Sequence, residues 1–286
     1  MGNVTRRRRV MLFTAIGVLC LLAVAAARSP WGIALLKSKE HFIVSAIDER
    51  VLYEPGAEAH GEAIARALPD AVALIEREHG LPFAHEFVVY VCATQAGING
   101  FLGQPPDTPI RGASVFSRTV FIAPRAFDFG GLDTHREALG HELSHLHLRQ
   151  RLGYFRHLTD IPTWFNEGLA DAATGSGGEH VSHERAIGSI LSGDCFVPDS
   201  RGSFPRPKRA RDYGVSYPML HAQSGMFVTY LREHRGDAFR EFLLDIQRRE
   251  RFASAFERRF GADVETMWDR FVQHVRDGHS EGATSR

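Results

Sequence analysis

The sequence predicts an α+β fold, because segments with strand character come first in the chain and segments with helical character follow. The strongest strand signal is the run of β-branched and aromatic residues in "EFVVYVCAT" (86–94). From Thr134 onward the apolar residues recur at helical spacing instead. We therefore expect a small mixed sheet, then one central helix, then a mainly helical C-terminal part.

The first half of the chain predicts strands around one helix. The expected elements are a strand over 42–55, a helix over 58–79, the strand at 86–94, and a hairpin or second strand over 112–124. Pro69 is expected to interrupt the helix, and Gly80 to close it as a left-handed cap. Ser117 and Arg118 lie near the expected hairpin turn.

The second half predicts helices. Thr134 and Glu137 match a capping box at the start of the central helix. The expected elements after it are a short helix in "PTWFNEGLADAAT" that ends before Gly175, a loop or lid over 175–211 with at most one brief helix near 185–191, and three or four amphipathic helices over 217–274, separated at Gly236 and Gly261.

The composition limits which classes of protein the chain can belong to. The chain has 286 residues, of which 44% are hydrophobic, so it can bury a sizeable core. Its 34 Lys and Arg residues equal its 34 Asp and Glu residues, so no global positive charge would attract nucleic acid. We expect no nucleic-acid partner.

The N-terminus differs from the rest of the chain. "RRRR" at 6–9 precedes a segment without charge at 10–27, which is long enough to span a bilayer as a helix. The sequence thus predicts a cytoplasmic basic tip and transmembrane signal anchor over 1–30, and one domain over 31–286 outside the cytoplasm, periplasmic or extracellular. A cleaved signal peptide has the same polarity, and the domain would then be secreted.

Three cysteines remain to be placed. Cys20 lies in the apolar N-terminal segment, which leaves Cys92 and Cys195. Outside the cytoplasm these two could form a disulfide, and two buried thiols are an equal alternative.

Within the central helix, "HELSH" holds His141, Glu142 and His145. Residues four apart on a helix are about 40° apart around its axis, so the two histidines can bind one tetrahedral metal ion. Glu142 falls beside them and can reach a metal-bound water without being a ligand. Apolar residues occupy the opposite side of the helix, namely Leu139, Leu143 and Leu146.

A catalytic zinc ion needs a third protein ligand and an open position. "WFNEGLAD" offers Glu167 on a separate short helix, which completes a His, His, Glu set. Asp171 follows one helical turn later and can accept a hydrogen bond from a ligand histidine. The two segments together predict one Zn²⁺ per chain.

The segments "HELSH" and "PTWFNEGLAD", with the tail patterns "HAQSGMFVTYLREHRG" and "FASAFERRFG", resemble the gluzincin metallopeptidases, and among them the peptidase MA-like domains. The resemblance covers roughly 42–274. It implies a zincin-like fold in which the central helix carries the active site. It also implies zinc held by His141, His145 and Glu167, with Glu142 as general base and Asp171 supporting a ligand.

The resemblance further implies an edge strand near 114–122 that can pair with an extended substrate. One departure from it concerns the oxyanion. Family members usually carry a tyrosine where this chain has His221, which can donate a hydrogen bond in the same role, and Tyr217 lies one turn earlier.

The sequence thus predicts a zinc-dependent peptidase that hydrolyses peptide or protein substrates. The alternative is an inactive zincin-fold binding or scaffolding protein at the membrane.

Other histidines and a basic run have plainer interpretations. His147 lies about 200° around the helix from His145, so we expect a structural role. His180 and His183 belong to the expected loop, where solvent exposure is the default and a substrate contact the alternative. "RPKRAR" at 206–211 is expected to be an exposed loop, with anionic lipid or an acidic partner as the alternative.

Overall fold

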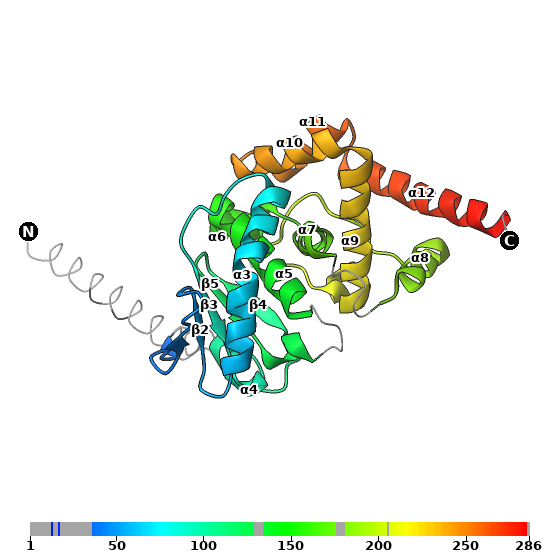
Figure 1. The fold of residues 1–286 in the computed structure, drawn as a ribbon. Helices are drawn as coiled ribbons and strands as arrows, with labels where there is room; N and C mark the ends of the chain where they lie inside the picture. The colour runs from blue at the N-terminus through cyan, green and yellow to red at the C-terminus, as the bar shows by residue number, and fades with distance from the viewer. Residues whose placement is uncertain are drawn as a thin grey trace, which may run out of the picture.

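The computed structural model describes residues 13, 17, 36–128, 134–175, 181–204 and 206–284 (Figure 1). In this part of the chain a small mixed sheet, with two helices between its strands, is followed by a series of further helices, so the predicted α+β class is confirmed.

The described strands form one sheet in the order β1-β2-β3-β5-β4. They are β1 (Ile43–Val44), β2 (Val51–Tyr53), β3 (Val88–Val91), β4 (Gly112–Val115) and β5 (Thr119–Ile122). The three central strands are parallel, and β1 and β4 are antiparallel strands at the two edges. The predicted hairpin at 112–124 is therefore confirmed, and it forms one edge of the sheet.

The single strand predicted over 42–55 is wrong, because the segment forms two short strands joined by a turn. The carboxylate of Asp48 accepts a hydrogen bond from the backbone N–H of Arg50, and its carbonyl accepts one from Val51 N–H. An Asp side chain that bonds the backbone two residues later favours a turn over a continuous strand.

Helix α3 (Glu58–His79) lies along one face of the sheet (Figure 1). Helix α4 (Gln95–Leu102) packs against the opposite face. The predicted interruption of α3 at Pro69 is wrong, since the helix runs through it. Pro69 is exposed, while Leu68 and Ile75 are fully buried on the sheet side, so packing of that face outweighs the missing hydrogen bond. Gly80 closes the helix with φ 77°, as predicted.

Helix α5 (Thr134–Leu152) connects the two halves of the molecule. Leu139, Leu143 and Leu146 pack into the core between the sheet and α3. Leu148 and Leu152 pack instead into a second core, which the C-terminal helices form. The helix is thus held from both sides, which fixes the direction of the side chains it presents between them.

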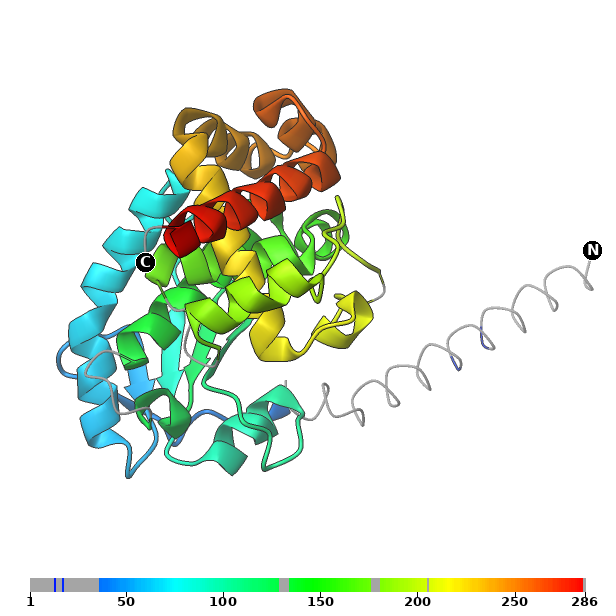
Figure 2. The ribbon, with the colours of Figure 1, turned by 90° about the vertical axis from the view of Figure 1, so that its right-hand side faces the viewer.

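The second core surrounds Trp164 and Phe165, which are fully buried. The helices around it are α6 (Tyr154–Asp160), α7 (Thr163–Thr174), α8 (His183–Ser192), α9 (Tyr217–His234), α10 (Gly236–Gln247), α11 (Phe252–Phe260) and α12 (Val264–Thr284). Helix α12 crosses over α8 and α9 (Figure 2). This confirms the mainly helical C-terminal part.

The predicted membrane anchor must be corrected. Within the described ranges, no helix combines the length and the apolar character that crossing a membrane requires. Apart from Phe13 and Gly17, the segment 10–27 that suggested the anchor lies outside the described residues. The membrane as a partner, and the location outside the cytoplasm that depended on it, therefore find no basis in the structure.

Candidate metal centre

The site begins with two imidazoles on one side of α5. Nε2 of His141 and Nε2 of His145 lie 3.0 Å apart, which is the convergence that their i, i+4 spacing predicts. The opposite side of the helix carries the buried leucines of the sheet core. The division between a site face and a core face is therefore confirmed.

Helix α7 brings a carboxylate to the same point. Oε2 of Glu167 lies 3.3 Å from Nε2 of His141 and 3.3 Å from Nε2 of His145. Two atoms that each lie about 2.0–2.1 Å from a tetrahedral zinc ion are about 3.3 Å apart. These three residues thus form a group whose ligand atoms could hold one metal ion.

Close contact between helices is what allows the three side chains to meet. A Cβ atom on Gly168 of α7 would lie 2.5 Å from the carbonyl oxygen of Ser224 on α9, and one on Gly140 of α5 would lie 2.7 Å from Thr174 Cγ2 on α7. At Gly168 only glycine lets α7 and α9 approach so closely, because the atom in the way belongs to the backbone, whereas at Gly140 a larger residue would have to displace the methyl group of Thr174 (Figure 1).

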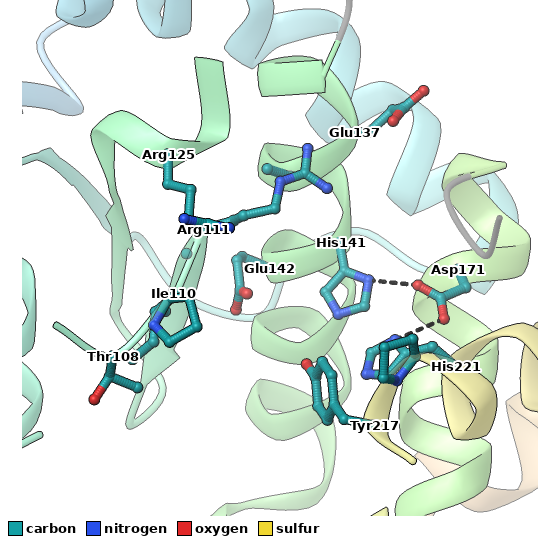
Figure 3. A pocket seen from close by; sticks show the side chains of 14 residues that line it. Thr108, Ile110, Arg111, Arg125, Glu137, His141, Glu142, Asp171, Tyr217 and His221 are labelled. Atoms are coloured by element: carbon teal, nitrogen blue, oxygen red, sulfur yellow. Dashed lines mark hydrogen bonds and ion pairs between the residues drawn. The ribbon is translucent and has the colours of Figure 1, made fainter. Parts of the chain in front are cut away.

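Asp171 bridges two histidines. Its Oδ1 lies 2.9 Å from Nδ1 of His141, and its Oδ2 lies 2.9 Å from Nδ1 of His221 (Figure 3). Each Nδ1 must therefore carry the proton that it donates, and in the neutral ring each Nε2 keeps a lone pair. The predicted support of a ligand histidine by Asp171 agrees with this geometry, and the second bond brings α9 into the site.

His221 points toward the same group. Its Nε2 lies 3.5 Å from Oε2 of Glu167, is buried, and has no hydrogen-bond partner among the described residues. The sequence alone placed His221 at the site only through the resemblance, whereas the structure ties it there by contacts.

The charges of the site stabilise one another. Burial alone would lower the pKa of His141, but the carboxylates of Asp171 and Glu167 raise that pKa well above its ordinary value. Burial alone would raise the pKa of Glu167, but His145 and His141 bring it well below its ordinary value. The opposed charges hold the histidines and the carboxylate together, and a metal ion bound here would have to displace the protons of the histidines.

Glu142 faces the edge strand rather than the group of His141, His145 and Glu167. Its Oε2 accepts a hydrogen bond of 2.7 Å from the backbone N–H of Ser114 on β4. A Cβ atom on Gly112 would lie 2.8 Å from Cγ of Glu142, so the glycine provides the space that this side chain fills. Glu142 nevertheless lines the same cavity as His141, so its second oxygen can reach a water molecule there.

A cavity of about 520 Å³ opens in front of these residues. Its lining includes His141, Glu142, Asp171, Tyr217 and His221 (Figure 3). Tyr217 is the first residue of α9, and its ring lies 4.3 Å from the ring of His221, centroid to centroid. The side chain of Tyr217 is 63% exposed, and a phenol with the ordinary pKa of about 10 keeps its proton at neutral pH, so its hydroxyl can donate.

Sequence reasoning missed Arg149. Its Nη1 donates to the carbonyl oxygens of Ser114 (2.9 Å) and Phe116 (2.8 Å) at the edge strand. The available signal was its spacing, because Arg149 follows Glu142 by seven residues and so lies on the same side of α5, two turns later.

His147 has the structural role predicted for it. Its ring is fully buried, its Nε2 donates to the carbonyl of Leu81, and its Nδ1 lies 3.0 Å from Nδ1 of His79. His183 is exposed on α8, and His180 lies outside the described residues.

Two of the four basic side chains in the run at 206–211 form ion pairs. Arg206 forms an ion pair with Asp212, and Lys208 forms one with Asp199. These pairs weaken the case for binding an anionic surface. Cys92 and Cys195 are both free thiols, so the disulfide is absent; Cys92 is buried, as the alternative expected, whereas Cys195 is only partly buried.

Comparisons with known proteins do not assign the chain to a family. No protein-family model and no curated protein matches the chain.

Proposed function

We propose that this chain is a zinc-dependent metallopeptidase of the gluzincin type with a zincin-like fold. The observation that carries the proposal is the convergence of His141 Nε2, His145 Nε2 and Glu167 Oε2 within 3.0–3.3 Å of one another. Two imidazoles and one carboxylate, with a cavity beside them, match the donor set of a catalytic zinc site rather than a closed structural one.

The protonation of His141, as well as the distances between the ligand atoms, fits a zinc ion. Because Asp171 accepts from Nδ1 of His141, the Nε2 lone pair of that ring is free for a metal. Zinc bound there would supply a Lewis acid and lower the pKa of a bound water toward 7.

Glu142 is the general base in this proposal. The backbone N–H of Ser114 holds Oε2, so Oε1 can accept a proton from the water and pass it to the leaving amine. A strand amide fixes the direction of the carboxylate without occupying both of its oxygens.

Tyr217 and His221 are the proposed donors to the oxyanion. Both line the cavity, and both belong to the first two turns of α9. The Tyr217 hydroxyl carries a proton at neutral pH, whereas Nε2 of His221 can donate only when its ring is doubly protonated.

The decisive experiment compares the wild-type chain with Glu142→Gln. We expect both proteins to bind one zinc ion, as measured by metal analysis. The wild type should cleave a peptide library in a chelator-sensitive way, and the variant should lose activity by at least about 10²-fold.

Three other results would contradict the proposal. A protein without stoichiometric zinc, or one that keeps it after both His145→Ala and Glu167→Ala, has a misassigned site. Zinc binding without any Glu142-dependent cleavage would favour the alternative, a binding protein that retains the metal.

A further inference from the structure

The outward-facing groups of the edge strand can be assigned from its pairing with β5. Ala123 N–H donates to the carbonyl of Arg111, so residues 111 and 123 form a hydrogen-bonded antiparallel pair. Because such pairs alternate, 113 and 121 form the next one, and the N–H and C=O groups of Gly112 and Ser114 point away from β5. These are the groups that an added substrate strand would use.

Both outward-facing groups of Ser114 already have partners from α5. Glu142 accepts from its N–H, and Nη1 of Arg149 donates to its C=O. The same Nη1 atom donates to the carbonyl of Phe116, at the turn that ends the strand. The Arg149 guanidinium therefore lies at the free edge of β4, where a neighbouring strand would have to run about 4.8 Å away.

Gly112 differs from Ser114. Within the described part of the chain, the structure records no hydrogen bond from its N–H or to its C=O in the outward direction, and the residue lines the cavity beside the group of His141, His145 and Glu167. One residue of the edge strand is thus open to a substrate, and it lies on one side of Glu142 only.

We infer that Arg149 is a specificity-determining residue that closes one half of the edge strand, so that a peptide substrate pairs with the strand at Gly112 alone. The inference rests on the proposed function and deepens it. On the Gly112 side the backbone of the substrate is held by strand pairing. On the Arg149 side the strand offers no free backbone groups. A substrate can bind there only through its side chains.

The test uses two series of peptide hydroxamates, which fix the register of the peptide because the hydroxamate binds zinc. One series extends toward the N-terminal side of the chelating group and the other toward the C-terminal side, from zero to four alanine residues. Affinities for the zinc-loaded full chain are measured by calorimetry, with Arg149→Gln as the variant. The matched control is Arg151→Gln, which removes a neighbouring arginine of α5 that donates to Pro82 instead.

In the wild type we expect one series to gain about threefold to tenfold in affinity with its first residue and then to level off, while the other stays flat. In Arg149→Gln the series whose affinity stays constant in the wild type should gain about threefold to tenfold in affinity with its first residue. Arg151→Gln should behave as the wild type. Wild-type affinity that rises with every residue on both sides would overturn the inference, and so would an Arg149→Gln variant that changes neither series.

Neither arm requires cleavage, so the result is separate from the test of the proposed function. If Arg149→Gln does not fold, the two wild-type series still decide. If the chain binds no zinc, the proposed function has failed, and this inference, which rests on it, fails with it.

Discussion

Nδ1 of His221 lies 2.9 Å from Oδ2 of Asp171, although fifty residues separate them in the chain. The other oxygen of the same carboxylate bonds Nδ1 of His141. A histidine on α9 and a proposed metal ligand on α5 are thus oriented by one side chain on α7. The orientation of both rings depends on the charge and position of Asp171.

Asp171→Asn is expected to weaken zinc binding by about 10–100-fold, because an amide accepts more weakly and can serve only one ring through its oxygen. Competition with a chelating dye measures the affinity. Asp245→Asn is the control, since Asp245 is an equally buried carboxylate that bonds Arg258 and Arg259 on α11 instead. Equal zinc affinities in all three proteins would remove Asp171 from the site.

Tyr217→Phe is expected to lower kcat by about 10²-fold with little change in KM or zinc content, because an oxyanion donor acts mainly in the transition state. Steady-state kinetics on a peptide cleaved by the wild type provides the measurement. Tyr154→Phe is the control, as Tyr154 is an exposed tyrosine on α6 away from the cavity lining. A fall in activity only in a His221→Ala variant would assign the role to the histidine.

Gly112→Ala is expected to reduce kcat/KM by about 10–10²-fold while leaving zinc bound. The added methyl group would lie 2.8 Å from Cγ of Glu142 and push the proposed base out of position. The control is Ser114→Ala on the same strand, which keeps the backbone N–H that Glu142 accepts from. Full activity in Gly112→Ala would show that Glu142 has room that the structure does not indicate.

Contacts between residues close in the sequence could be predicted, whereas contacts between distant segments could not. The pairing of His141 with His145 is local, since helical geometry alone brings them together. The contact of His221 with Asp171 depends on how closely α7 approaches α9, which is set by Gly168 against the backbone of Ser224. No periodicity along the sequence carries that information.

The same distinction holds for the fold. The C-terminal end of α3 was predictable because Gly80 caps it locally, but its passage through Pro69 depends on burial against the sheet. Helix α4 was missed although Thr94 caps it and Gly103 ends it. Gly97 and Gly100 lower its helical propensity, and packing of its apolar side chains on the sheet compensates for them.

Gly168→Ala tests the helix contact directly. A methyl group 2.5 Å from a backbone oxygen forces α7 and α9 apart, so we expect a loss of about 1–3 kcal/mol in the free energy of unfolding. Zinc affinity should fall with it, because Glu167 precedes this glycine. Gly188→Ala on α8, where the methyl group meets no atom within 4 Å, should instead stabilise by about 0.5–1 kcal/mol. Urea unfolding of the zinc-free proteins measures whether each substitution lowers or raises the free energy of unfolding.

His79 at the end of α3 and His147 on α5 form a buried pair, which predicts that the protein loses stability in acid. Nε2 of His147 faces the Leu81 carbonyl and must donate, so in the neutral ring its Nδ1 accepts from Nδ1–H of His79. His79 Nε2 then accepts from the Ser144 hydroxyl. Protonation of His147 would place two Nδ1–H donors face to face, and burial lowers the pKa of His79 well below its ordinary value, so both rings are neutral in the fold at neutral pH.

Burial lowers the pKa of His147 to about 4, below the value of about 6.5 in the unfolded chain. Below about pH 6.5 the unfolded state binds a proton that the folded state does not, so this contribution to stability is present above that pH and is lost as the pH falls toward 4. Between pH 7.5 and pH 5 it amounts to about 2 kcal/mol. Urea unfolding of the zinc-free protein at both values should show a pH dependence that is smaller by this amount in His147→Gln, whose amide can still donate to Leu81. An identical pH dependence in both proteins would mean that His147 is protonated in the fold.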